Sequence, residues 1–460
     1  MAKATKNPPA APGREAEEAA GNVRPIADFE SGATLPTEFA RDVISATDAE
    51  VIGTSQVERT DAYPGTPGSE AVGEELMTIN LGPHHPATHG VLRLLVSIEG
   101  EVVRDMKPVV GYVHTGIEKS CEKHSYWKVI PFVERMDYLA YFSNMQAYCG
   151  AVERLLEIEI PPRAKYLRTI HLELNRLHSH LVWLGTSALD LGAISMFWYC
   201  FRERDTILDL VEMSTGQRMH TRYFQVGGVF EDVPVGFERR LRAFCEEMPT
   251  RIEQYQALLD RNEIFLRRTK GVGIVPRERL LELGVTGPLL RAAGEPWDLR
   301  KAQGALAYPD LDFKIPVGTV GDCYDRYRVR VAEMRESTRI ISQALDGLPE
   351  GPHAIDDRKI VLPPRDELAV SMEALIHHFK LVTEGFRVPP GEAYNAVESP
   401  RGEIGCFVVA DGSSRPARVH FREPSFVNLQ ALRDMSVGGY IADLVANLAM
   451  LDPILGGIDR

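Results

Sequence analysis

The sequence predicts an α+β fold that is mainly helical, and three observations lead to this prediction. Apolar residues recur at three- and four-residue steps through the middle of the chain. A segment with apolar residues at every second position precedes this region, and a short apolar strand bounded by glycines follows it near the carboxyl end. The expected architecture is therefore a helical bundle with a small antiparallel sheet before it and a short β region after it.

The chain has 460 residues, and its composition changes near residue 76. Residues 1–75 are rich in Pro, Ala, Gly and Ser and carry no periodic apolar face, which predicts a flexible, disordered extension. Glutamates in its opening run argue against a mitochondrial transit peptide, because such peptides are poor in acids. The remainder is expected to be one domain with three regions: a β-hairpin region (76–130), a helical bundle (131–345) and a C-terminal α/β region (346–460).

Charge and cysteine content narrow the classes of function. Lys plus Arg total 52 against 65 Asp plus Glu, so the formal net charge of −13 disfavours nucleic acid as a partner. Six scattered cysteines form no CxxC pair and no signal peptide opens the chain, so we expect reduced thiols in a cytosolic setting. The most apolar stretches, 188–201 and 441–455, are too short or too interrupted to span a bilayer.

The hairpin region opens with GPHHPATHGVLRL, residues 82–94, in which His85 and His89 lie four positions apart. Clustered histidines are common metal ligands, but positions i and i+4 share a face only on a helix, and the prolines and glycines here indicate a loop. The alternative is a structural turn whose histidines cap backbone groups. Alternating apolar residues begin directly after His89 and return from Val102 to Tyr112, so the turn lies at one end of a small sheet.

Four helices are expected in the bundle. They cover about 136–156, 167–184, 195–213 and 237–268. The second carries His171, Asn175 and His178, which could be ligands but are more typical of satisfied polar groups between packed helices. Between the third and fourth, the loop GQRMHTRYFQVGGV contains Arg218, His220 and Arg222, a pattern suited to presenting charge at a partner's surface.

Five motifs, taken together and in order, resemble one known family. They are GPHHPATHGVLRL, GYVHTGIEK (111–119), ERMDYLAYF (134–142), ESPRGE (398–403) and the terminal DPILGGIDR. From about residue 77 to the end, the chain closely resembles the 49 kDa, or D, subunit of bacterial-type NADH:quinone oxidoreductase, respiratory complex I. That family is similar to the large subunit of nickel-iron hydrogenases, so the resemblance implies a hydrogenase-large-subunit-like bundle.

The hydrogenase comparison bears on metal binding. Those enzymes hold nickel and iron with four thiolates from two CxxC pairs, the second in a terminal DPCxxCxxH motif. Here Asp452 and Pro453 are kept, but Ile454 and Gly457 replace the thiolates and Arg460 replaces the histidine. The early pair is missing as well, so the soft ligands that nickel and iron require are absent. We expect no metal, and the resemblance implies that the vacated pocket receives a quinone headgroup.

The resemblance also implies the residues of that site. His89 corresponds to the family's headgroup histidine, Tyr138 to the tyrosine at the other headgroup carbonyl, and Asp190 to the carboxylate that partners the histidine. Such a carboxylate holds the tautomer of the imidazole and favours its charged form. As alternatives, Tyr138 could be a core aromatic residue of an amphipathic helix. Asp190 could cap a helix that begins near Ala193.

The electrons for quinone reduction are expected to come from a partner. The chain has neither a glycine-rich dinucleotide fingerprint nor cysteine spacing for an iron–sulfur cluster, so we expect it to bind no cofactor by itself. The resemblance places the cluster in a neighbouring small subunit, with Arg135 and His220 beside it. The alternative role of these two residues is an interface salt bridge or a cap.

The resemblance thus implies the quinone-site subunit of a proton-translocating NADH:quinone oxidoreductase, active only in the assembled complex. Its expected partners are the small cluster-bearing subunit, other peripheral-arm subunits, membrane-arm subunits and quinone. Its expected location is peripheral, at the cytoplasmic face of the bacterial cell membrane. The alternative is a structural, hydrogenase-like scaffold subunit without a redox site of its own.

Overall fold

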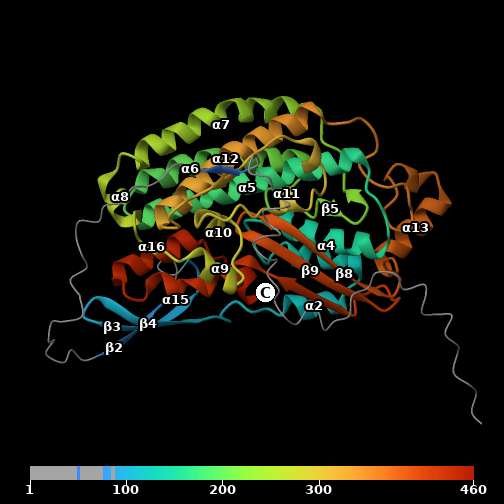
Figure 1. The fold of residues 1–460 in the computed structure, drawn as a ribbon. Coiled ribbons are helices and arrows are strands. Elements are labelled where there is room, and N and C mark those ends of the chain that lie inside the picture. The colour runs from blue at the N-terminus through green and yellow to red at the C-terminus, as the bar shows by residue number, and fades with distance from the viewer. Residues whose placement is uncertain (1–48, 52–75, 84–88) are drawn as a thin grey trace, which may run out of the picture. The chain divides into compact units, whose positions relative to one another are not determined.

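The structure, a computed structural model, describes residues 49–51, 76–83 and 89–460 (Figure 1). The predicted α+β, mainly helical fold is confirmed. The helices are α2 (Ile117–Lys123), α3 (Tyr126–Val133), α4 (Tyr141–Leu155), α5 (Pro162–Asp190), α6 (Ile194–Thr215), α7 (Phe237–Leu259), α8 (Glu263–Thr269), α9 (Arg277–Glu282), α10 (Pro288–Ala292), α11 (Leu299–Ala302), α12 (Cys323–Asp346), α13 (Met372–Thr383), α14 (Pro424–Leu429), α15 (Ala431–Ser436), α16 (Ile441–Leu451) and α17 (Leu455–Asp459), with 3-10 turns η3 (Tyr308–Asp310) and η4 (Glu367–Ala369). The strands are β1 (Ala49–Val51), β2 (Met77–Leu81), β3 (Arg93–Glu99), β4 (Val102–Val109), β5 (Phe224–Gln225), β6 (Gly228–Val229), β7 (Ile315–Val317), β8 (Gly391–Ser399), β9 (Gly402–Ala410) and β10 (Arg418–Arg422).

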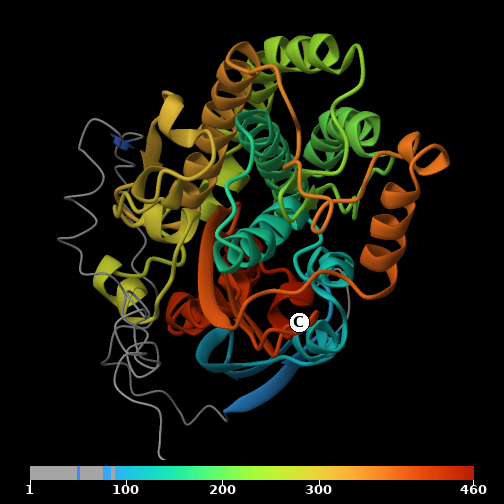
Figure 2. The same ribbon diagram turned by 90° about the vertical axis from the view of Figure 1, so that its right-hand side faces the viewer.

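Helix α5 is the centre of the bundle. It packs against α6 and α12, and α7 packs on both of these helices (Figures 1 and 2). Pro162 occupies its first turn, where a missing amide hydrogen costs nothing. Because neighbouring helices cover it on several sides, α5 buries residues around most of its circumference, charged ones included. It ends at Asp190, one residue before a turn in which Gly192 has a φ of 88°.

Two three-stranded antiparallel sheets flank the bundle. In the first, with the order β2-β3-β4, strand β3 buries Leu94, Val96 and Ile98 at alternate positions, as the period-two pattern predicted. The second has the order β10-β9-β8, and α4 packs on β8 and β9. Strand β1 lies inside the segment 1–75 and pairs in parallel with β7. The rest of that predicted extension lies outside the described residues.

The helix predicted over 136–156 is wrong at its start. Helix α3 ends at Val133 and α4 begins at Tyr141, with a tight turn between them. In this turn Asp137 Oδ1 accepts the amide hydrogens of Leu139 and Ala140, each at 3.1 Å. In a continuous helix these two amides would bond to backbone carbonyls one turn earlier instead. Tyr138 therefore lies on a turn and is not the core aromatic residue of an amphipathic helix.

The helix predicted over 237–268 is divided in two. Helix α7 ends at Leu259, and α8 starts after Asn262, whose side chain accepts the amide hydrogen of Phe265 at 3.1 Å. Asparagine is a strong N-cap, so it stabilises a new start that the apolar periodicity conceals. The third predicted helix, 195–213, is confirmed as α6 with one or two residues more at each end.

Candidate functional site

The turn that carries His89 is held against the end of the chain. His89 has a φ of 50° and Gly90 a φ of 116°, two left-handed residues that redirect the chain into β3. A Cβ on Gly90 would lie only 3.0 Å from Leu455 Cδ1 in α17. Only glycine can therefore bring this turn so close to the terminal helix.

Asp190 reaches the same turn from the last position of α5. The Nε2 atom of His89 lies 3.1 Å from Asp190 Oδ2, and both side chains are partly exposed. The alternative role for Asp190 is wrong, because α6 has Ala193 at its N-cap and no side chain caps it. The folded chain thus pairs the histidine and the carboxylate that the family resemblance had pointed to, whereas their chemical role stays a prediction.

Tyr138 projects from the turn between α3 and α4 and is 38% exposed. Burial raises the pKa of its hydroxyl, and the nearby Asp137 and Asp452 raise this pKa further, whereas Arg401 lowers it. A raised pKa keeps the phenol protonated at neutral pH. Tyr138 is therefore available as a hydrogen-bond donor.

A buried charged cluster lies behind Tyr138. Arg401, in the turn between β8 and β9, is 2% exposed and donates from Nη1 to Asp137 Oδ2 at 2.9 Å. It also donates from Nη2 to Asp452 Oδ1 at 3.2 Å and from Nε to the Asp452 backbone oxygen at 2.9 Å. Burial raises the pKa of Asp452, and His89 is among the charges that lower it. Asp452 is therefore the common neighbour of Tyr138 and His89.

The terminal segment 452–457 connects the two turns. Its Leu455 touches Gly90, and a Cβ on Gly456 would collide with the backbone oxygen of Met136, two residues before Tyr138. One short segment thus packs against the His89 turn on one side and the Tyr138 turn on the other. The terminal segment therefore holds the two turns, and with them His89 and Tyr138, on either side of itself.

Glu423 lies against Gly457, the position that the motif comparison aligns with a hydrogenase cysteine. Its carboxylate atoms Cδ and Oε1 lie 2.7 Å from the place that a Cβ on Gly457 would take. Its Oε2 accepts the amide hydrogen of Phe426 at 2.9 Å as the N-cap of α14, and its Oε1 has no partner among the described residues. Burial raises the pKa of Glu423 to about 7, and Asp137 raises it while Arg401 and Arg460 lower it.

Arg135 and His220 also come together, from positions 85 residues apart in the sequence. Arg135 is exposed, and its charge is near enough to lower the pKa of His220, after the larger effect of burial. The loop that carries His220 is fixed because Arg222 donates its amide hydrogen to Glu134 Oε1. Burial raises the pKa of Glu134 to about 7. These residues form a second polar surface next to the Tyr138 turn.

Comparison with known proteins decides the family. Residues 190–460 match the family model described as the 49 kDa subunit of respiratory-chain NADH dehydrogenase. A D subunit of NADH-quinone oxidoreductase from Roseiflexus sp. (strain RS-1) is 54% identical over 390 residues, which cover 84% of this chain and 94% of the relative. A D subunit of the same enzyme from Koribacter versatilis is 51% identical over 395 residues, covering 86% and 98%.

The chain belongs to the 49 kDa, or D, subunit family. It is therefore one subunit of a multi-subunit oxidoreductase, complex I. This agrees with the resemblance drawn from the five motifs.

Other polar residues of this 49 kDa-type subunit have structural partners. His171 Nδ1 lies 2.8 Å from the Leu167 oxygen and its Nε2 lies 2.8 Å from Ser214 Oγ, while Asn175 donates to the Leu139 oxygen at 2.9 Å. Arg204 donates to His178 Nε2 at 3.0 Å. The interpretation of His171 and Asn175 as satisfied polar groups is confirmed. Across residues 49–51, 76–83 and 89–460, no three His, Cys, Asp or Glu side chains form a potential metal site, and His85 lies outside these ranges.

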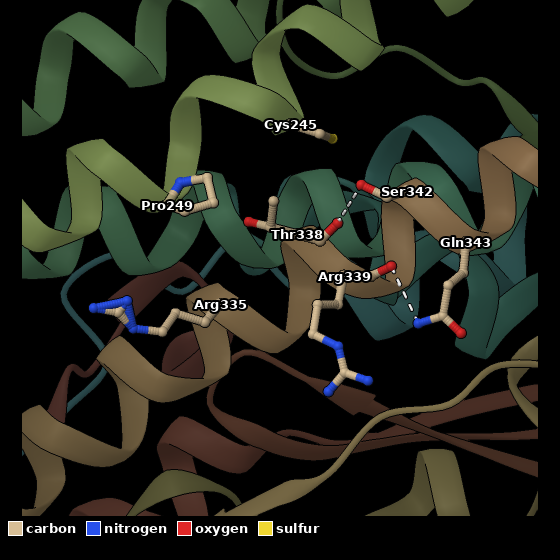
Figure 3. A pocket seen from close by; sticks show the side chains of 7 residues that line it. All are labelled: Cys245, Pro249, Arg335, Thr338, Arg339, Ser342 and Gln343. Atoms are coloured by element: carbon tan, nitrogen blue, oxygen red, sulfur yellow. Dashed lines mark hydrogen bonds between the residues drawn. The ribbon is translucent and has the colours of Figure 1, made fainter.

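One cavity of this 49 kDa-type subunit lies apart from the candidate site. It has a volume of about 530 Å³, and its lining side chains come from α7 and α12 alone (Figure 3). They are Cys245, Pro249, Arg335, Thr338, Arg339, Ser342 and Gln343. Pro249 lacks the amide hydrogen that would bond the preceding turn of α7, a local defect that accompanies this opening.

In the described part of the chain, no helix is both long and apolar enough to cross a bilayer.

The buried Glu423 predicts a pH-dependent stability. Its pKa is about 7 in the folded chain against 4.5 for an unperturbed glutamate, so its contribution is complete below pH 4.5 and is lost as pH rises to about 7. Glu423→Gln removes this dependence. The melting temperature of the variant relative to the parent should therefore be higher at pH 8 than at pH 5, by an amount equivalent to about 3 kcal/mol at most.

Thermal unfolding of the purified chain at the two pH values measures this difference. Glu101→Gln is the matched control, because Glu101 is exposed and its substitution should shift stability equally at both pH values. If Glu423→Gln shifted the melting temperature equally at pH 5 and pH 8, the conclusion that Glu423 has a raised pKa in the folded chain would be wrong.

Proposed function

We propose that this subunit binds the quinone headgroup between His89 and Tyr138 in a proton-translocating NADH:quinone oxidoreductase. The observation that carries the proposal is the joint placement of the His89–Asp190 pair, 3.1 Å apart, and the Tyr138 turn against one terminal segment. The relatives' name, NADH-quinone oxidoreductase, supplies the reaction class.

The chemistry requires donors at two places. Reduction of a quinone to a quinol takes two electrons and two protons, and negative charge develops on two oxygens at opposite sides of the ring. Tyr138 supplies one hydroxyl donor. In an imidazolium both ring nitrogens donate, so with Nε2 directed at Asp190, Nδ1 of His89 serves the other oxygen. Asp190 keeps the imidazole oriented and balances its charge.

The source of electrons is proposed to be an iron–sulfur cluster in a partner subunit next to Arg135 and His220. An exposed guanidinium at this surface suits a neighbour that gains negative charge on reduction. The polar surface that carries both residues adjoins the Tyr138 turn, so a cluster there would lie near the quinone. In this proposal the subunit is peripheral, at the cytoplasmic face of the bacterial membrane, between the cluster-bearing subunit and the membrane arm.

The test is Tyr138→Phe, which removes the hydroxyl and keeps the ring. The fold should survive, because Tyr138 is partly exposed and no described side chain requires its oxygen. Loss of one hydrogen bond to the headgroup should cost roughly 1–3 kcal/mol of quinone binding. This corresponds to a KM for quinone that is about 5- to 150-fold higher, clearest with short-tailed analogues, and steady-state quinone reduction by the assembled complex measures it.

Tyr112→Phe is the matched control. Tyr112 is also an exposed tyrosine, but its hydroxyl accepts a hydrogen bond from Arg93 in the hairpin sheet. Its removal should leave the KM for quinone unchanged. An unchanged KM in Tyr138→Phe as well would favour the alternative of a structural scaffold.

A further inference from the structure

Helix α13 exposes an apolar stripe. Met372, Leu375, Ile376 and Phe379 are 79%, 52%, 46% and 66% exposed. They occupy positions i, i+3, i+4 and i+7, so they share one face of the helix. Val370, just before the helix, is exposed too. This face consists of large hydrophobic side chains and points to solvent.

The opposite face of α13 is the one that packs inward. It buries only Ala374 and Leu381, and the helix packs mainly on the short turn η4. Figures 1 and 2 both show α13 at the edge, apart from the main bundle. In an isolated soluble subunit, a surface helix normally turns its large apolar residues inward. Helix α13 does the opposite, because it exposes them and buries only one alanine and one leucine. An exposed apolar stripe of this kind marks an interaction surface.

A basic cavity adjoins the carboxyl end of this helix. It has a volume of about 430 Å³ and lies where the end of α13 meets the α2–α3 turn and the loop before β10. Its lining residues are Lys123, His124, Ser125, Lys128, Thr383, Glu384, Gly385, Arg387, Ser414 and Arg415. Within the described ranges, Lys123, Lys128, Arg387 and Arg415 form no ion pair, and one carboxylate, that of Glu384, lines the cavity with them.

A buried hydroxyl faces the same cavity without a partner. Ser125 is 7% exposed, and no described group hydrogen-bonds its Oγ. A buried donor without an acceptor is costly, and four cations at one cavity repel one another with only one carboxylate, Glu384, to offset them. Both costs fall when an anionic group enters the cavity. The cavity therefore favours an occupant with negative charge, and the neighbouring stripe favours a partner surface with apolar side chains.

We propose that the α13 stripe and the basic cavity form one docking surface for another subunit of the complex, which inserts a segment with carboxylates beside apolar side chains. Aspartate or glutamate of that segment would enter the cavity, and its apolar residues would cover Leu375 and Phe379. The chain belongs to a multi-subunit complex, so other subunits are its natural partners. The proposal does not depend on quinone binding.

A membrane suits this surface less well. Helices that lie on anionic bilayers carry several Lys and Arg on their polar face, whereas α13 itself carries one lysine, Lys380, beside Glu373, His377 and His378. A cavity of about 430 Å³ also accepts an inserted side chain better than a flat bilayer surface does. A protein segment is therefore the occupant that both the shape and the charge favour.

The experiment places the photoreactive residue p-benzoylphenylalanine at position 379 in the assembled complex. The expected product is a crosslink to another subunit, at a stretch that contains both Asp or Glu and apolar residues. The double substitution Lys128→Glu with Arg415→Glu should reduce the crosslink by about tenfold or more. Replacing the acidic residues of the crosslinked stretch by Lys should restore it, which distinguishes lost docking from misfolding.

The matched controls are residues of similar exposure that lie outside the proposed docking surface. Ile264 on α8 is 66% exposed, as is Phe379, and a probe there should give products that the double substitution leaves unchanged. Lys314→Glu, at an exposed lysine outside the cavity, should leave the crosslink from position 379 intact. A crosslink to lipid, to a second copy or to residues 1–75 of this chain would overturn the proposal. No crosslink, or one that survives the double substitution, would overturn it too.

Discussion

His89→Ala is expected to lower the rate of quinone reduction by about 10²- to 10⁴-fold, the range that a positioned proton donor contributes. The fold should be little affected, because both His89 and its partner Asp190 are partly exposed and water can replace the imidazole at the carboxylate. The effect should appear mainly in kcat, since the lost donor acts as negative charge develops on the quinone oxygen. Steady-state kinetics of the assembled complex measure it.

Two controls separate a site defect from misassembly. NADH oxidation by ferricyanide, which takes electrons upstream of the quinone, should continue at a near-normal rate in His89→Ala. His353→Ala, at a partly buried histidine outside the site, should leave both activities unchanged. Asp190→Asn keeps the shape but weakens the orientation of His89, so its effect should be smaller. Normal quinone reduction in His89→Ala would contradict the headgroup assignment.

Arg401→Met is expected to destabilise the folded chain by about 3–5 kcal/mol, because it leaves two buried carboxylates without their cation. Arg401 is 2% exposed and is hydrogen-bonded to Asp137 and Asp452. Burial raises the pKa of Asp452 and Arg401 lowers it, so without Arg401 this carboxyl takes up a proton more readily and stability should be lowest at alkaline pH. The yield of the subunit in purified complex and its thermal unfolding measure this loss.

The source of this destabilisation is open to a separate test. If uncompensated charge is responsible, adding Asp137→Asn and Asp452→Asn to Arg401→Met should recover part of the stability. If lost packing were responsible, the triple variant would be no better than the single one. Arg104→Met is the matched control, because Arg104 pairs with Glu99 at the surface and such pairs contribute about 0–1 kcal/mol.

Local pattern predicted most of the regular structure. The alternation of Leu94, Val96 and Ile98 predicted β3, and the three- and four-residue steps predicted the bundle helices. The pattern failed where a side chain bonds to the backbone and ends a helix. Asp137 does this in the turn before α4 and Asn262 does it before α8, and apolar periodicity contains no trace of either bond.

The candidate site was found by resemblance, and part of it was missed. His89, Tyr138, Asp190, Arg135 and His220 were named from the family resemblance. Arg401, Asp452 and Glu423 were not assigned to the site, although the first two stand in the quoted motifs ESPRGE and DPILGGIDR. A signal did exist for these two. A charged residue inside a motif of glycine and proline turns often has a buried partner, and here each motif supplies the partner of the other.

The sequence by itself determined the family, the helical and strand periodicity and the absence of thiolate ligands at Ile454 and Gly457. Each of these depends on residue type and on spacing between near neighbours. Only the tertiary structure decided that Arg401 joins Asp137 to Asp452, and that the apolar face of α13 points outward. A buried charge or an exposed apolar face is defined by which distant segments pack against it, and contacts across hundreds of residues leave no periodic pattern in the chain.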